Sequence, residues 1–179
     1  MALILKNLDE QTRKAMLEEV DYDTKNGLLY FSPRLSDFGR NEYPQLLVKS
    51  ISDGNDSTLA ESLRHGCFNS TETRKKPKGG TTQAKIPSTA PDTLAEGEFN
   101  RFYIRALCRI VIDTGKGQLK VCRVRHSANP RPESEMKIGQ VVDAALLLED
   151  IKNNIGIDTF LGIPAGPNSG LGVELVDMN

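Results

Sequence analysis

The chain has 179 residues, 38% of them hydrophobic, and its 23 lysines and arginines nearly balance its 24 aspartates and glutamates to give a formal net charge of −1. This charge excludes a uniformly basic nucleic-acid-binding protein and an acidic tail, and the length suits one domain. With no tryptophan and only 6% aromatic residues, the core is expected to consist mainly of leucine, isoleucine and valine.

Three widely spaced cysteines, Cys67, Cys108 and Cys122, are an odd number. They argue against a disulfide framework and for a reducing compartment. The apolar start of the chain is too short for a signal peptide, and no run approaches the roughly 18 apolar residues of a membrane span. We therefore expect a cytoplasmic protein with no membrane contact.

Residues 1–66 are predicted to form a helical N-terminal region. Three helix starts are expected from cap patterns and from a first-turn proline, at Asn7, at Pro44 and at Thr58. Residues 67–92 carry little hydrophobic periodicity and are predicted to be a basic loop or arm, with one edge strand over residues 81–87.

Residues 93–179 are predicted to form an α+β core. Thr93 and Glu96 form a third capping-box pattern, and the apolar residues that follow it recur at spacings of three and four, which predicts a central helix over residues 93–114 that stops at Gly115. A second helix is expected over residues 144–153, capped by Asp143. Strands are expected at residues 119–125, 157–163 and 171–176, with an extended turn at 129–132. The last two strands would be joined by a loop or hairpin over residues 164–170, within a glycine-rich segment at 162–172.

These elements predict a single α+β domain. A central amphipathic helix would pack on a small mixed or antiparallel sheet, and the N-terminal helices would cover it or extend from it.

The nearly neutral total hides an uneven distribution of charge. Residues 64–137 hold 15 basic and seven acidic residues, a net of +8, whereas the rest of the chain holds eight basic and 17 acidic residues, a net of −9. Arginine and lysine suit phosphates and carboxylates, so this basic centre predicts an anion-binding or partner-binding surface. Its residues are expected to be Arg74, Lys75, Lys76, Lys78, Arg101, Arg105, Arg109, Arg123 and Arg125.

Arg101, Arg105 and Arg109 lie four residues apart and would form a stripe along one face of the central helix. Like charges at this spacing repel one another, so an anionic group is expected to neutralise them. Two sources are open: an external partner, or the acidic ends of the chain folding back on the basic centre.

Two sites with specific chemistry are weaker alternatives. If residues 110–120 formed a hairpin, Asp113, Gln118 and Lys120 would loosely resemble the carboxylate and (Asp/Glu/Gln)-x-Lys elements of restriction-like nucleases, which bind a divalent ion and stabilise charge at phosphate. A zinc site could also be drawn from His65, Cys67, Cys122 and His126, although the spacing is poor and no Cys-x-x-Cys is present.

The sequence therefore favours a non-enzymatic binding or assembly protein that needs no cofactor and uses a basic central surface to dock an anionic partner. This partner would be a protein surface, of another protein or of a second copy of the chain in self-assembly, or, second, a nucleic-acid backbone. A chain this rich in loops is also easier to explain if partners hold it in a larger complex or a virus particle. The alternative is a metal-dependent, nuclease-like phosphodiester hydrolase built around Asp113 and Lys120.

Overall fold

The computed structural model describes residues 2–126, 129–155 and 170–177. Within them the helices are α1 (Glu10–Lys25), α2 (Asp37–Asp53), α3 (Asp56–Leu63), α4 (Ala90–Thr114), α5 (Pro132–Glu135) and α6 (Ala144–Asn153). The strands are β1 (Thr71–Lys75), β2 (Thr81–Lys85), β3 (Gln118–Arg123), β4 (Val141–Val142) and β5 (Leu171–Val176). This mixture of helices and small antiparallel sheets in a single domain confirms the predicted α+β class.

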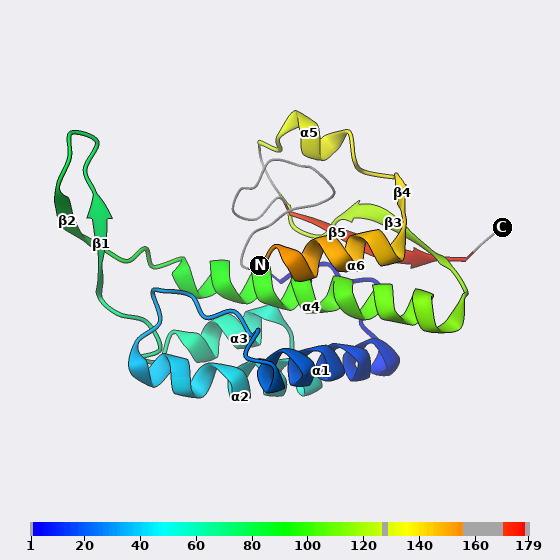
Figure 1. Cartoon of the computed structure of the whole chain (residues 1–179), viewed down its shortest axis with the longest axis horizontal. Coiled ribbons are helices and arrows are strands. Elements are labelled where there is room, and N and C mark those ends of the chain that lie inside the picture. The colour runs from blue at the N-terminus through cyan, green and yellow to red at the C-terminus, as the bar shows by residue number, and fades with distance from the viewer. Residues whose placement is uncertain (1, 127–128, 156–169, 178–179) are drawn as a thin grey trace.

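Helix α4 runs through the middle of the molecule (Figure 1). Helices α1, α2 and α3 form a layer on one side of it, and α6 lies with the sheet of β3, β4 and β5 on the other. The β1–β2 hairpin projects away from both layers, beside the N-terminal end of α4 (Figure 1).

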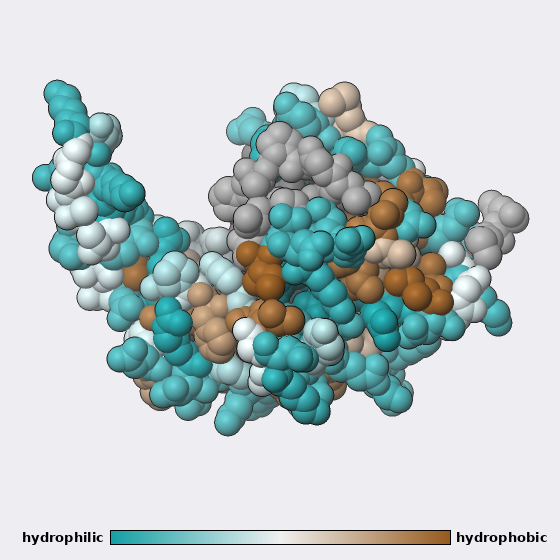
Figure 2. Space-filling model, viewed as in Figure 1, coloured by the Kyte–Doolittle hydropathy of each residue, from teal (hydrophilic) through white to brown (hydrophobic). Residues whose placement is uncertain are grey.

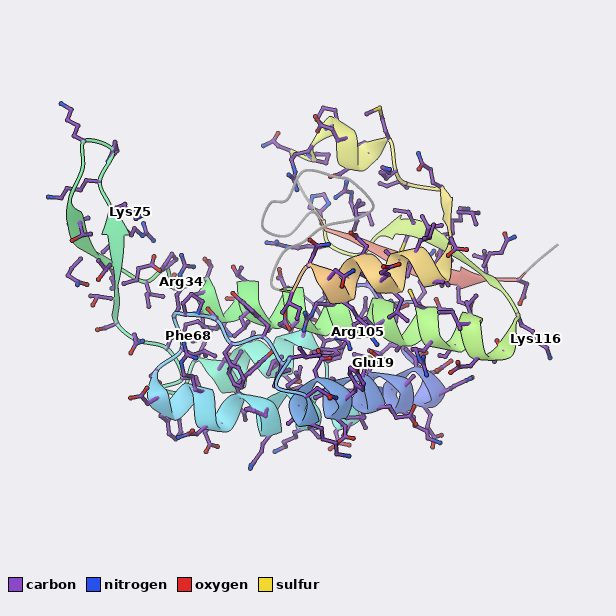
Figure 3. All side chains as sticks on the ribbon, viewed as in Figure 1. Glu19, Arg34, Phe68, Lys75, Arg105 and Lys116 are labelled. Atoms are coloured by element: carbon purple, nitrogen blue, oxygen red, sulfur yellow. The ribbon has the colours of Figure 1, made fainter. Side chains whose placement is uncertain are left out.

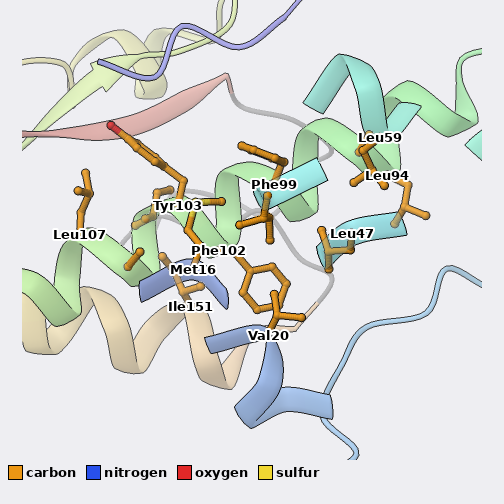
Figure 4. Close-up of a cluster of buried hydrophobic side chains, with 14 of the residues drawn as sticks. Met16, Val20, Leu47, Leu59, Leu94, Phe99, Phe102, Tyr103, Leu107 and Ile151 are labelled. Carbon is orange, nitrogen blue, oxygen red and sulfur yellow. The ribbon is translucent and has the colours of Figure 1, made fainter. Parts of the chain in front are cut away.

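Helix α4 confirms the predicted central helix. Its aromatic side chains Phe99 and Phe102 are fully buried in one cluster with Met16 and Val20 of α1 and with residues of α2, α3 and α6 (Figure 4). The predicted stop is also present, since Gly115 caps the helix with a φ of +64°. This left-handed conformation favours glycine.

Several helix starts differ from the prediction. Helix α4 begins at Ala90 and not at Thr93, because Pro91 suits the first turn. Helix α2 begins seven residues before Pro44, where the Ser36 hydroxyl accepts a hydrogen bond from the Gly39 amide. The box that opens α3 is formed by Asn55 with Thr58, so that Thr58 is the third helical residue and not the cap.

Asn7 does not cap α1. The cap is Asp9, whose carboxylate accepts a hydrogen bond from the Thr12 amide at 2.8 Å. The Asn7 side chain instead accepts a bond from the Leu175 amide at 2.9 Å, and its backbone amide donates to the Tyr103 hydroxyl at 3.1 Å. Asn7 therefore joins the N-terminal segment to β5 and to α4.

The three-stranded sheet is antiparallel, in the order β4-β3-β5. Leu119 and Val121 of β3 are buried, and Val121 lies opposite Val173 of β5. Strand 171–176 and the Asp143 cap of α6 are confirmed. Residues 129–132 are not one extended turn, because Pro132 begins α5. The predicted strand 157–163 and nearly all of the loop 164–170 lie outside the described residues.

Candidate functional site

The predicted arginine stripe on α4 is mostly inside the protein. The Arg105 side chain is 1% exposed, and its guanidinium donates two parallel hydrogen bonds to the Asp23 carboxylate at 2.6 and 2.8 Å. A third bond joins its Nε to the Glu19 carboxylate at 2.7 Å. Figure 3 shows Glu19 of α1 and Arg105 of α4 beside each other between the two helices.

Arg101 is also buried, at 7% exposed. Its Nη2 lies 3.0 Å from a carboxylate oxygen of Glu98 and 3.5 Å from one of Asp23. The guanidinium groups of Arg101 and Arg105 both lie about 5 Å from the Phe102 ring, at 5.1 and 5.0 Å from its centroid. Two members of the expected surface stripe are therefore core residues.

Arg109 is the exposed end of the stripe. Its side chain is 47% exposed, and its nitrogens lie 3.8 Å from carboxylate oxygens of Glu19 and Asp113. A further cation, the Lys152 ammonium of α6, lies 3.3 Å from a carboxylate oxygen of Glu19. The sequence left open whether an external partner or the chain's own acidic residues neutralise the stripe. In the structure, the acidic residues Glu19 and Asp23 of α1 pair with it.

Burial and ion pairing act in opposite directions on the pKa values of this network. Burial raises the pKa of Glu98 to about 7, even though the guanidinium groups of Arg101 and Arg105 oppose that shift. For Arg105, burial by itself would lower the pKa, but hydrogen bonds and charges from Asp23 and Glu19 outweigh it and raise the pKa. The network is thus built around a permanently charged Arg105.

The two arginines of β3 and the segment after it also have carboxylate partners. Arg123 pairs with Glu135 at the end of α5. Arg125 Nε lies 3.1 Å from the Glu96 carboxylate, so Glu96 is a partner for arginine and not a capping residue. Burial raises the pKa of Glu96, and the charge of Arg125 partly offsets this shift.

The hairpin that the nuclease alternative requires does not form. Helix α4 continues through Asp113 to Thr114, and β3 begins at Gln118 after a three-residue turn. The Asp113 side chain is 60% exposed, and its ion-pair partner is Arg109 of its own helix. Gln118 is exposed and Lys120 half-buried on β3. The hairpin expected over residues 110–120, on which the arrangement of Asp113, Gln118 and Lys120 around one metal depends, is therefore wrong.

The zinc alternative is also not supported by the geometry. His65 follows α3 with a side chain 77% exposed, Cys67 is buried beneath the start of α2, and His126 is exposed after β3. Burial raises the pKa of the Cys67 thiol and raises that of Cys122 to about 11. Over residues 2–126, 129–155 and 170–177, no group of three or more histidine, cysteine, aspartate or glutamate side chains is placed to hold a metal ion.

The remaining predicted residues lie on the β1–β2 hairpin, which we call the arm (residues 71–85). Its strands pair in register, with Thr71 opposite Lys85 and Lys75 opposite Thr81. Because side chains alternate along a strand, Lys75 and Lys85 share one face with threonines and Gln83. Lys76 and Lys78 lie in the turn, where Gly79 and Gly80 have φ angles of +89° and +79°.

The arm has unpaired positive charge. Lys75, Lys76, Lys78 and Lys85 are all exposed, and none of them forms an ion pair with any residue that the structure describes. Arg74 differs, since it pairs with Glu72 on the opposite face of the arm. Figure 2 shows the arm as a projection with a hydrophilic surface.

An ion pair and a β-bridge join the base of the arm to the segment before α2. Arg34 donates to both carboxylate oxygens of Glu72, at 2.6 and 3.1 Å, and these bonds together with Arg74 lower the pKa of Glu72. Leu35 forms a β-bridge with Phe68. Arg34 and Phe68 lie at this base and Lys75 farther out along the arm (Figure 3). The arm therefore leaves the body in a defined direction.

Comparisons with protein-family models, with curated proteins and with solved structures found no match to this chain. In the described part of the chain, none of the helices combines the length and apolar character that crossing a membrane requires. Strand β1 and the Arg34–Glu72 pair were not expected from the sequence. A signal for the hairpin was present, since threonine-rich runs flank a Gly-Gly turn.

Proposed function

We propose that this chain is a non-enzymatic binding or assembly protein that docks an anionic partner with the arm. One observation carries the proposal: four exposed lysines gather on one projecting hairpin without a carboxylate partner among the described residues, whereas Arg101, Arg105, Arg123 and Arg125 all have one. Neighbouring like charges repel one another, so an external anion would stabilise this arrangement.

The shape of the arm supports the same function. A two-stranded hairpin with both strands at an edge is marginally stable in water, and here all but two of the residues 71–85 are exposed. The Glu72 face is tied to Arg34 of the body, which leaves the face of Lys75 and Lys85 open. A partner that covers this face would need no rearrangement of the core.

The test is binding to anionic polymers of defined chemistry: poly-L-glutamate, heparin and duplex DNA, each followed by fluorescence anisotropy or by retention on a column. We expect the parent protein to bind at least one of them at low salt. The arm variant replaces four lysines by glutamine, at Lys75, Lys76, Lys78 and Lys85. We expect it to lose this binding.

A matched control removes the same charge elsewhere. It carries the same substitution at four exposed lysines on α1, on α2 and after α4, namely Lys14, Lys25, Lys49 and Lys116. The control should bind as the parent does. If the parent binds none of the polymers, or if both variants bind equally, the arm is not a docking site and the proposal fails.

A further inference from the structure

The side chains and the shape of the arm indicate which class of anionic partner it binds, and this inference rests on the proposed function. We infer that the arm binds the phosphate backbone of double-stranded DNA without reading its sequence, by placing its lysine-bearing face and turn in or along the major groove.

Side-chain composition favours phosphate over a protein surface. Protein interfaces draw most of their binding energy from aromatic residues and arginine packed in apolar pockets. The arm has no aromatic residue, and its single arginine, Arg74, is paired with Glu72. Its exposed groups are lysine ammonium, threonine hydroxyl and glutamine amide, which are the donors that proteins direct at phosphate oxygens.

Shape favours a duplex. A two-stranded antiparallel ribbon has strands about 5 Å apart, and the major groove of B-DNA, about 12 Å wide, admits such a ribbon. Lys75 and Lys85 lie at opposite ends of one face, about 13 Å apart along the strands at the usual rise per residue. Lys76 and Lys78 extend this cationic surface around the turn.

The turn also permits close approach. A side chain at Gly79 or Gly80 would have no heavy atom within 4 Å of its Cβ. The backbone of the turn is therefore open to solvent, and a phosphate could approach it. Lysine on an exposed strand also discourages pairing with other strands. That role does not account for Lys76 and Lys78, because they lie in the turn.

The other nucleic acids fit less well. Proteins that bind single strands stack the bases on aromatic side chains, and the arm has none. The major groove of an RNA duplex is too deep and narrow for side chains to read. Base-specific contacts are typically bonds from arginine or lysine to guanine and from asparagine or glutamine to adenine. In the arm, Arg74 is paired with Glu72 and the Gln83 amide donates to Thr73 at 3.0 Å, which leaves the lysines as the cations with no ion-pair partner in the described part of the chain. We therefore expect binding that is indifferent to sequence.

The experiment measures binding of the parent protein to two unrelated 20-base-pair DNA duplexes over a range of NaCl concentrations. Each neutralised phosphate contributes about −0.9 to the slope of log K against log salt. Four lysines thus predict a slope of about −3.6, which is roughly a 150-fold loss of affinity between 50 and 200 mM salt. The two duplexes should agree within about threefold.

The variants and competing polymers separate this inference from the proposed function. The arm variant should lose the salt dependence and most of the affinity, while the four-lysine control keeps both. Tighter binding to poly-L-glutamate, to single-stranded DNA or to duplex RNA than to duplex DNA would overturn the inference but leave an anion-binding arm. Binding to none of these polymers and not to heparin would overturn both, and so would DNA binding that the arm variant retains in full.

Discussion

Replacing Arg105 by methionine should destabilise the protein severely. Methionine keeps helix propensity and much of the side-chain volume, but it removes the three hydrogen bonds to Asp23 and Glu19. Both carboxylates are buried. Asp23 would keep only a contact of 3.5 Å to Arg101, whereas Glu19 would keep Lys152 at 3.3 Å. The larger share of the loss therefore arises at Asp23.

Removing one partner of a buried ion pair costs about 3–5 kcal/mol, because the other charge stays buried without compensation. Domains are stable by only about 5–15 kcal/mol, so Arg105→Met should remove a large fraction of the total. In a chain of this size, a loss of that order lowers the unfolding temperature by roughly 6–20 °C.

The assay is urea unfolding followed by circular dichroism at constant pH. The matched control is Arg109→Met, one turn farther along α4, where ion pairs at 3.8 Å and a half-exposed side chain limit the expected cost to about 1 kcal/mol or less. Arg105→Lys keeps the charge without the parallel bonds and should fall between the two. Equal costs for Arg105→Met and Arg109→Met would refute the reasoning.

Three further outcomes follow from other contacts. Because burial raises the pKa of Glu98 from 4.5 to about 7, the folded chain keeps a proton that the unfolded chain loses, so the free energy of unfolding should fall as the pH rises from about 4.5 to 7. Glu98→Gln should remove that part of the slope, and an unchanged slope would contradict the assignment. Gly39→Ala should cost about 1–3 kcal/mol, since its Cβ would lie 2.0 Å from the Cys67 carbonyl oxygen; an unchanged unfolding temperature would show that the contact relaxes freely. Asn7→Ala should cost about 1–3 kcal/mol, measured by urea unfolding, because it leaves the Leu175 amide without its partner, whereas a loss below about 0.5 kcal/mol would show that water replaces the bond.

Elements with strong local signals were predictable from the sequence. Helix α6 starts after Asp143, whose carboxylate accepts a bond from the Leu146 amide at 2.9 Å, and β5 covers residues 171–176 as expected. The observed N-caps of α1 and α3, Asp9 and Asn55, differ from the expected Asn7 and Thr58 because their side chains are better placed to accept a bond from the first turn. Pro44 lies inside α2 because packing of Tyr43 and Leu47 on the same helix continues across it, which is a tertiary effect that local patterns do not encode.

The candidate site was only partly predictable. A spacing of four residues places arginines on one helix face whether that face is exposed or buried, so Arg101 and Arg105 gave no sign of their burial. A complementary signal was present in α1, where Glu19 and Asp23 are also four apart and flank the buried Val20. Two helices that carry stripes of opposite charge at the same spacing are expected to pack against each other. The acidic pattern of α1 and the basic pattern of α4, taken together, predict the internal network.

The arm is also the only covalent connection between the helices α1–α3 and the rest of the fold. A protease that cuts after Lys78 would therefore divide the chain into two pieces, one with three helices and one with α4 and the sheet. These pieces would stay together, because α4 packs against α1 and α3 through a common core. The turn at Gly79 and Gly80 is accordingly a natural place to split the gene, and two separately expressed fragments should reassemble into the native protein.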